Sequence, residues 1–319
     1  MRKKILALVL VLSMILVGCS SKNNVDTSNK EKSVNNTKKL NVVASFFPLY
    51  DLVKKVGGDK INAVNLTQTG SGHGYEPSID DMAKIVKSDL LLINGAGFES
   101  WIERIKDEKI NTLTMGEHID LIKIKDVHEH SNDKDDHEED HSHGDHDPHL
   151  WLSPKNLKKM LELIKDKLIE IDQKNKEYYI ENFNKYNKEF DILIGEYDKE
   201  LSKYNGKEIV VPHEAFNYLF KPYNIRQIAM AGINSTDDPN TGRMAEITKL
   251  LKEKNIKTVF YEYGQSDKIA KTIASEINGN VKALSTMEVI GEKDLKEGED
   301  LISIMRMNLK NIVDSFEGK

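Results

Sequence analysis

From Leu40 onward, short apolar runs alternate with segments in which apolar residues recur every three or four positions. Three of the runs have the length of buried strands: LNVVAS (40–45), INAVNLT (61–67) and DLLLING (89–95). The segments between them, at 48–57 and 80–88, have the spacing of amphipathic helices. Strands that alternate with helices are typical of a parallel sheet covered by helices. We therefore predict an N-terminal α/β lobe over residues 40–175.

The same alternation returns after residue 205. Four runs there have strand length: KEIVVP (207–212), IRQIAMA (225–231), IKTVFYE (256–262) and NVKALS (280–285). Three segments between them have helical spacing: 214–224, 243–255 and 266–278. This repetition predicts a second α/β lobe over residues 205–319.

A helical stretch at 176–204 lies between the two predicted lobes. Its aromatic and leucine residues recur at steps of three and four: Tyr179, Phe183, Tyr186, Phe190, Leu193, Tyr197, Leu201 and Tyr204. A stripe with this spacing is typical of a core-facing helix surface rather than a cofactor site. At 1.5 Å per residue the stripe runs about 40 Å, long enough to brace both lobes. The predicted fold class is therefore α/β, with two β/α lobes joined by one long rigid helix.

The first 18 residues have the pattern of a lipoprotein signal peptide. The basic residues Arg2–Lys4 precede 13 mostly apolar residues (5–17), and Cys19 then follows a small residue, which resembles a lipobox. The apolar segment is too short to span a bilayer comfortably, so an uncleaved anchor helix is the weaker alternative. Cys19 is the only cysteine, and we predict that it is lipidated and that no intrachain disulfide forms. Residues 19–39, rich in Ser, Asn, Lys and Thr, are predicted to form a flexible tether.

Negative charge is concentrated in one segment. The net charge of −6 becomes −9 once the three basic residues of the signal are removed. Residues 128–149 contain nine carboxylates and one lysine and so contribute −8 of this charge. The rest of the mature chain, at about −1, offers no basic stripe for phosphate contacts, which argues against nucleic-acid binding. Acidity that coincides with imidazoles indicates cation binding.

The acidic segment also holds seven of the ten histidines. HEEDH (137–141) matches the letters of a zinc-protease helix, but its neighbours supply no apolar face for such a helix. A solvated charge run without a role is a second interpretation. We favour a mobile loop over 128–146 that gathers or senses zinc through weak additional sites. Its candidate ligands are the histidines of the loop: His128, His130, His137, His141, His143 and His146.

Three isolated histidines have a different setting. His73 follows a predicted strand within TGSGHGYEPSIDD, and His213 directly follows KEIVVP. His149, in DPHLWLSP, precedes a helix for which Ser153 is the expected N-cap and Pro154 the first position. Sheets of α/β proteins present ligands at strand ends and loop–helix junctions. A lone histidine is more often a surface or hydrogen-bonded residue than a ligand, but the matched settings in both lobes predict a shared site.

Five motifs carry a family resemblance: SFFPLYDLVKKVGGDKI, GSGHGYEPSIDD, INGAGFESWIERI, DPHLWLSP and PHEAFNYL. Together they make the chain similar to the zinc- and manganese-binding receptors of bacterial ABC importers, with the zinc branch as the better match. The resemblance runs in order from about Leu40 to the C-terminus. It implies the metal-receptor type of periplasmic-binding-protein fold, with one metal in the cleft between two lobes.

The resemblance also implies a ligand set. His73, His149 and His213 stand at the matching motifs, and the fourth ligand of the family is usually a carboxylate or a water from the last strand region. Glu288 in VKALSTMEVIG occupies that place, and Glu262 in FYEYG is the runner-up.

Four further residues have simpler expected roles. Asp147 and Glu76 are candidates to accept hydrogen bonds from the ligand imidazoles, because they are close to ligands in sequence. Trp151 is expected to pack rather than bind, and His118 to be a surface or structural residue.

Three imidazoles and one carboxylate make a four-coordinate site that suits Zn²⁺. Mn²⁺ favours more oxygen ligands, and the manganese members of the family tend to carry a carboxylate where His213 stands. We therefore predict one tight zinc site, with a manganese-specific receptor as the alternative.

The predicted function is zinc capture at the cell surface by a monomeric lipoprotein, which hands the metal to the membrane permease of an ABC importer. High Lys, Asn and Ile content is compatible with a Gram-positive source, in which the receptor sits on the extracytoplasmic face of the membrane. A surface zinc hydrolase is the competing class, but it would need an open coordination position, which Glu288 would close. An adhesin has no signal in the sequence.

Overall fold

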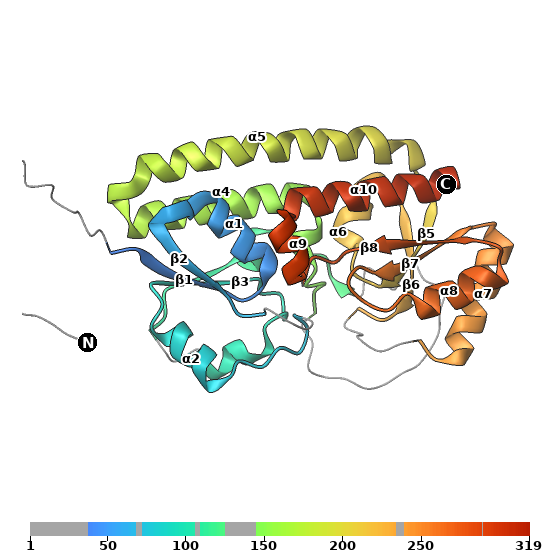
Figure 1. Ribbon diagram of the computed structural model, residues 1–319, viewed down its shortest axis with the longest axis horizontal. Helices are drawn as coiled ribbons and strands as arrows, with labels where there is room; N and C mark the ends of the chain where they lie inside the picture. The colour runs from blue at the N-terminus through green and yellow to red at the C-terminus, as the bar shows by residue number, and fades with distance from the viewer. Residues whose placement is uncertain (1–37, 68–71, 106–108, 125–144, 234–238, 289) are drawn as a thin grey trace, which may run out of the picture. The chain divides into compact units, whose positions relative to one another are not determined.

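Parallel pairing of the three predicted strands with a fourth, short strand that was not predicted forms a four-stranded sheet in the N-terminal half of the chain (Figure 1). The computed structural model describes residues 38–67, 72–105, 109–124, 145–233, 239–288 and 290–319. The sheet has the order β2-β1-β3-β4: β2 (Ile61–Asn65), β1 (Leu40–Ala44), β3 (Leu90–Ile93) and β4 (Thr112–Thr114). The predicted signal peptide, Cys19 and nearly all of the tether lie outside the described residues.

Both faces of this sheet are buried, which explains why its strands are nearly continuous apolar runs. Helices cover it on two sides: α1 (Phe47–Gly57), α4 (Pro154–Ile171) and α5 (Lys176–Leu201) on one, and α2 (Ile79–Val86) on the other (Figure 1). Along β1, Val42 belongs to the apolar cluster of the first face and Val43 to that of the second, where it joins Ile85 and Trp101. The period-two alternation of strand side chains thus feeds two cores.

Two pairs of parallel strands build the C-terminal half: β5 (Glu208–His213) with β6 (Arg226–Ala231), and β7 (Thr258–Glu262) with β8 (Asn280–Leu284). Strand β5 lies beside β7. Helices α7 (Thr241–Lys254) and α8 (Lys268–Glu276) cover one face, where Val210 and Val259 are buried. Val211 and Phe260 point into the larger cluster on the other face. The alternation of strands and helices predicted for both halves is confirmed.

One predicted helix is shorter than expected. Residues 214–224 were predicted to be helical throughout, whereas α6 spans only Asn217–Phe220 and a 3-10 turn follows at Lys221–Tyr223. Pro222 has no backbone N–H to continue the helix, and Asn224 ends the turn with a φ of 52° in the left-handed region. The short helix presents Asn217 and Tyr218 to the segment that carries His149.

Helix α5 matches the predicted linking helix, and its aromatic stripe is core, as predicted. Tyr179, Phe190 and Tyr197 are completely buried. Near one end of α5, Asn182 Nδ2 donates to the Val56 carbonyl of α1 at 3.0 Å, and farther along the Tyr197 hydroxyl donates to the Met305 carbonyl at 2.6 Å. Because one apolar cluster extends along α5 into both halves, residues Lys39–Lys319 form one compact unit. The lobe boundaries at 175/176 and 204/205 stay a prediction.

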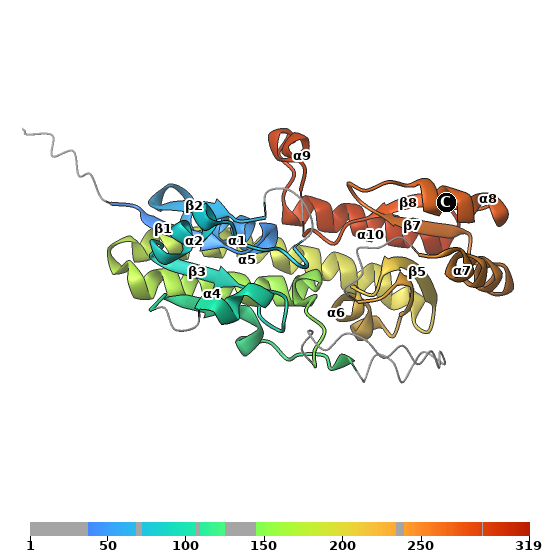
Figure 2. The ribbon, with the colours of Figure 1, turned by 90° about the horizontal axis from the view of Figure 1, so that it is seen from below.

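Two helices near the C-terminus were not among the predicted elements: α9 (Glu292–Glu297) and α10 (Leu301–Glu317). Helix α10 lies against α5 and β8 (Figures 1 and 2). Asp300 begins it as N-cap, because its Oδ1 accepts a hydrogen bond from the Ser303 N–H at 2.9 Å. No helix in the part of the chain that the structure describes has both the length and the apolar character needed to cross a membrane.

A buried lysine ties α1 to the start of α10. Lys55 Nζ lies 2.6 Å from Oδ2 of Asp300 and 3.1 Å from Oδ2 of Asp51. Burial by itself would lower the pKa of Lys55, but the two carboxylates outweigh it and raise the pKa above its usual value. The three charges therefore join elements that are more than 200 residues apart in sequence.

Candidate metal centre

Four segments bring the predicted ligands together. His73 precedes α2, His149 precedes the 3-10 turn Leu150–Leu152 that leads into α4, His213 is the last residue of β5, and Glu288 follows β8. One ligand atom from each of the four lies within 4.8 Å of all the others. Three of the four segments follow the carboxyl ends of parallel strands, where α/β folds assemble sites.

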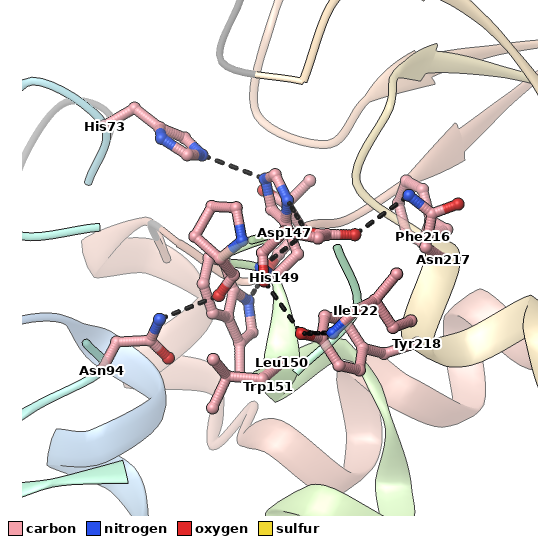
Figure 3. A network of polar contacts seen from close by, with 12 residues as sticks. His73, Asn94, Ile122, Asp147, His149, Leu150, Trp151, Phe216, Asn217 and Tyr218 are labelled. Atoms are coloured by element: carbon pink, nitrogen blue, oxygen red, sulfur yellow. Dashed lines mark hydrogen bonds and ion pairs between the residues drawn. The ribbon is translucent and has the colours of Figure 1, made fainter. Parts of the chain in front are cut away.

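The site is largely closed to solvent. His149 is completely buried, and Glu288 is 5% exposed. Nε2 of His73 lies 3.0 Å from Nε2 of His149 (Figure 3) and 3.6 Å from Oε1 of Glu288. Four ligands at about 2.1 Å from a tetrahedral metal would stand about 3.4 Å apart. The two imidazole nitrogens at 3.0 Å would therefore have to separate slightly, and any pair near the outer limit of 4.8 Å would have to approach, for the set to fit an ion.

An orphaned nitrogen marks the same place. Nε2 of His213 is buried and has no hydrogen-bond partner among the described residues. Leaving a buried polar atom unpaired costs about 1–3 kcal/mol, which a metal bond would remove. The donor set of three imidazoles and a carboxylate therefore fits a borderline divalent cation.

Asp147 orients His149. Its Oδ1 lies 2.8 Å from Nδ1 of His149 and also accepts the backbone N–H of His149 at 2.9 Å (Figure 3). Its Oδ2 accepts a hydrogen bond from Asn217 Nδ2 at 2.9 Å. Because a carboxylate only accepts, Nδ1 carries the proton and Nε2 keeps its lone pair for a metal. The role predicted for Asp147 is confirmed.

Glu262 lies behind His213 and is not one of the four clustered residues. Its Oε2 is 3.6 Å from Nδ1 of His213, and its Oε1 accepts from the backbone N–H and the hydroxyl of Thr286 at 3.0 and 2.6 Å. Of the two carboxylates considered for the fourth position, Glu288 is the one that the structure places with the histidines. Burial alone lowers the pKa of His213, but the nearby carboxylates, led by that of Glu262, raise it above its usual value.

The segment before Glu288 is fixed from several directions. Its backbone turns at Met287, which has a φ of 61° and is buried. Asn308 of α10 accepts the Ser285 N–H at 2.9 Å and donates to the Ser285 carbonyl at 2.8 Å. Glu288 Oε2 accepts the Gly72 N–H at 3.1 Å. Sequence reasoning missed Asn308 because α10 was not predicted, and its only local signal is an amide on an apolar helix face.

The remaining expectations divide. Trp151 is buried and packs edge-on against Phe46 with ring centroids 4.7 Å apart, so the prediction that it packs is confirmed. His118 is exposed, as expected. The prediction that Glu76 accepts a hydrogen bond from a ligand imidazole is wrong, because Glu76 is exposed and pairs with the Arg104 guanidinium.

The histidine-rich loop is described only at its base. His128, His130, His137, His141 and His143 lie outside the described residues. His146, which the sequence placed in the loop, instead forms an antiparallel bridge with Lys123. The neighbouring Ile124 N–H donates to the Asp145 carbonyl at 3.0 Å, and the Asp147 N–H donates to the Ile122 carbonyl at 2.8 Å. His146 therefore belongs to the folded base, because backbone pairing with 122–124 includes it.

Comparisons with known proteins agree on one group. The family model described as ZnuA, the periplasmic component A of a zinc-uptake complex, matches residues 42–315. The zinc-binding lipoprotein AdcA of Streptococcus pneumoniae is 33% identical over 313 residues, which cover 97% of this chain and 60% of that protein. The high-affinity zinc uptake system protein ZnuA of Bacillus subtilis is 30% identical over 298 residues, covering 91% of this chain and 92% of that one.

A solved structure is similar as well. The Zn(II)-bound ZnuA-like domain of Streptococcus pneumoniae AdcA has a TM-score of 0.75 and 30% identity, and the match covers 87% of this chain and 99% of that one. The similarity confirms the predicted fold class. The chain spans about three fifths of the length of the streptococcal lipoprotein that it matches.

Proposed function

The chain belongs to the ZnuA family of zinc-uptake components, and on this basis we propose that it captures zinc outside the cytoplasm and delivers it to the membrane permease of an ABC importer. Zinc is then the cargo of the site. The observation that carries the proposal is the convergence of His73, His149, His213 and Glu288 from four separate segments.

The donor set supports zinc over manganese as the cargo. Zn²⁺ usually takes four ligands, and three imidazoles with one carboxylate supply both that number and the ligand types that Zn²⁺ binds. Mn²⁺ favours oxygen ligands. His213 is the deciding residue, since it supplies nitrogen where an oxygen ligand would favour manganese. We propose one tight zinc per chain.

Capture rather than hydrolysis fits the arrangement of the carboxylates. A zinc hydrolase needs an open coordination position and a carboxylate or other base beside the metal-bound water. Glu288 fills the fourth position in our proposal, and the carboxylates of Asp147 and Glu262 face the Nδ1 atoms of ligand histidines. A receptor without turnover is therefore the favoured function.

We propose that Cys19 is lipidated and anchors a monomeric receptor on the extracytoplasmic face of the membrane, in a Gram-positive cell. The support is the basic and apolar N-terminus followed by a single cysteine. The stretch 128–146 is proposed to gather or sense zinc, because it combines six histidines with eight carboxylates. Deleting 128–143, which leaves the paired base intact, is expected to remove weak zinc binding and to keep the tight site.

The experiment that tests the proposal is native mass spectrometry of the mature protein with competing Zn²⁺ and Mn²⁺. We expect one zinc that survives mild chelation, and its loss in the His73→Ala, His149→Ala, His213→Ala and Glu288→Ala variants. His118→Ala is the matched control, since it removes an exposed imidazole that is not one of the four clustered residues. Tight binding that persists in the four variants, or hydrolysis of a model ester by the zinc-loaded protein, would overturn the proposal.

A further inference from the structure

Two carboxylates face the ligand histidines in similar ways. Asp147 contacts Nδ1 of His149, and Glu262 faces Nδ1 of His213. We infer that Glu262, oriented by Thr286, is a positioning residue that holds the proton on Nδ1 of His213 and so leaves Nε2 free to bind the metal. The inference deepens the proposed function and rests on it.

Thr286 determines how the Glu262 carboxylate is turned. The Thr286 N–H and hydroxyl both bond to Oε1, at 3.0 and 2.6 Å. Oε2 is left facing His213, is buried, and has no hydrogen-bond partner in the described part of the chain. The 3.6 Å between Oε2 and Nδ1 is an ion-pair distance, and a shift of about 0.7 Å would make it a hydrogen bond.

Thr286 is itself anchored to the opposite half of the site. Its carbonyl accepts the indole N–H of Trp151 at 2.6 Å, and Trp151 lies two residues after His149. The His149 and Trp151 ring centroids are 5.2 Å apart. Thr286 also lies two residues before Glu288. The orientation of Glu262 is thus set by a residue whose own position depends on the segments of two other ligands.

The hydrogen-bond donors and acceptors around Glu262 predict that the conservative substitution Glu262→Gln will be unusually harmful. A backbone N–H can only donate, so in Glu262→Gln the amide oxygen must take the Oε1 position beside Thr286. The amide NH₂ then faces His213 and donates to Nδ1. That contact favours the tautomer with the proton on Nε2, which cannot bind a metal. Glu262→Gln should therefore impair binding at least as much as Glu262→Ala, which leaves room for water to accept from Nδ1.

The test measures zinc affinity of the full mature protein by competition with a fluorescent chelator. Loss of a residue that supports a metal ligand typically weakens binding about 10–100-fold, and we expect this range for Glu262→Gln with one zinc still bound. Thr286→Val, which replaces the hydroxyl with a methyl group, should weaken binding, and Thr286→Ser, which keeps the hydroxyl, should bind as the wild type does. Glu246→Gln, an exposed change on α7, is the matched control.

Two further readouts separate positioning from general structure and from direct ligation. Nitrogen NMR of the His213 ring reports the tautomer, which should change in Glu262→Gln while the melting temperature of the metal-free protein does not. The Co²⁺ absorption spectrum should keep its tetrahedral intensity in Glu262→Ala and lose it in His213→Ala. If Glu262→Ala instead gave the spectrum of His213→Ala, Glu262 would be a ligand and the inference would be wrong.

The remaining outcomes distinguish this inference from the proposed function. Wild-type zinc affinity and an unchanged His213 tautomer in Glu262→Gln would overturn the role of Glu262. The proposed function would still stand in that case, provided that zinc binding depends on His213. Failure of the wild-type protein to bind zinc would overturn both. Should Glu262→Gln not fold, the Thr286→Val and Thr286→Ser pair decides: equal affinities in the two variants would contradict the inference.

Discussion

Oδ1 of Asp147 lies 2.8 Å from Nδ1 of His149, and both side chains are completely buried. Two residues of one short motif therefore have separate tasks, since the histidine presents Nε2 to the site and the aspartate fixes its orientation. The same aspartate accepts from Asn217, which lies four residues after His213. This contact links the segments of two ligands that are far apart in the chain.

Asp147→Asn is expected to weaken zinc binding about 10–100-fold. The His149 N–H can only donate, so the amide oxygen must stay on that side and the amide NH₂ then meets the NH₂ of Asn217. This donor–donor contact will displace one of the two side chains. Chelator competition measures the effect, with Asp145→Asn as an exposed control two residues away. Equal affinities of the two variants would refute the orienting role.

Gly72→Ala should disturb the fourth ligand, because the added methyl group would lie 3.5 Å from Oε2 of Glu288. A methyl group at this position would lie 2.5 Å from Cζ of Phe98, so the backbone or the ring must move. Because the Gly72 N–H donates to Glu288, we expect weaker zinc binding together with a lower melting temperature. Gly74→Ala is the control for space, since no atom lies within 4 Å of its added carbon, although its φ of 70° adds backbone strain. Unchanged zinc affinity in Gly72→Ala would contradict the expectation.

Asn308→Leu is expected to destabilise the fold by about 1–3 kcal/mol per unsatisfied group, because the Ser285 N–H and carbonyl would both lose buried partners. Zinc affinity should fall as well, since the turn that carries Glu288 would loosen. Asn311→Leu on the same helix removes one hydrogen bond, to the Ala283 carbonyl, at a partly buried position. Urea unfolding compares the two, and an equal loss in both would show that Asn308 has no special role.

Lys55→Met is expected to lower the free energy of unfolding by about 3–5 kcal/mol at neutral pH, because Asp51 and Asp300 would lose the buried cation and would have to stay charged without it or take up a proton. Lys60→Met, which breaks the exposed pair with Asp59, should cost less than about 1 kcal/mol. Similar losses in the two variants, measured by urea unfolding, would mean that the buried triad adds nothing.

The same triad predicts a dependence on pH. The pKa of Lys55 is raised in the fold, so its contribution is complete below the unfolded value of about 10.4 and is lost as pH rises through the folded pKa. The pKa of Asp300 is lowered overall: burial alone would raise it, but the Lys55 charge outweighs burial. Its contribution is therefore present above about pH 3.9 and is lost as pH falls through the folded pKa. The pKa of Asp51 is raised by burial, so the contribution of Asp51 to the pH dependence of stability has the opposite sign to that of Asp300.

Urea unfolding of the wild type and of Lys55→Met across the pH range measures how much the Lys55 ion pairs contribute to stability at each pH. The difference in unfolding free energy between the two proteins should be largest near neutral pH and should shrink toward both extremes. A difference that stayed constant up to pH 11 would contradict the assignment for Lys55.

The sequence by itself determined the strands of the described residues except β4 (Thr112–Thr114), most of the helices and the three histidines. Buried strands in parallel sheets need apolar residues on both faces, and α5 needs a stripe at helical spacing, so both leave a local pattern that can be read directly. His73, His149 and His213 could be named because each follows or precedes such an element. The family assignment drawn from the motifs is confirmed by the match over residues 42–315.

Only the tertiary structure decided which carboxylate stands with the histidines and what supports them. The strand pattern alone does not separate Glu288 from Glu262, since both come at or after the end of a predicted strand, and only the family resemblance ranks Glu288 first. The left-handed turn at Met287 and the amide of Asn308 direct one into the cluster, while Thr286 turns the other toward His213. The contacts of Asn308 and Thr286 join residues more than 20 positions apart through two hydrogen bonds each, which impose no periodicity on the chain and so leave no pattern to read.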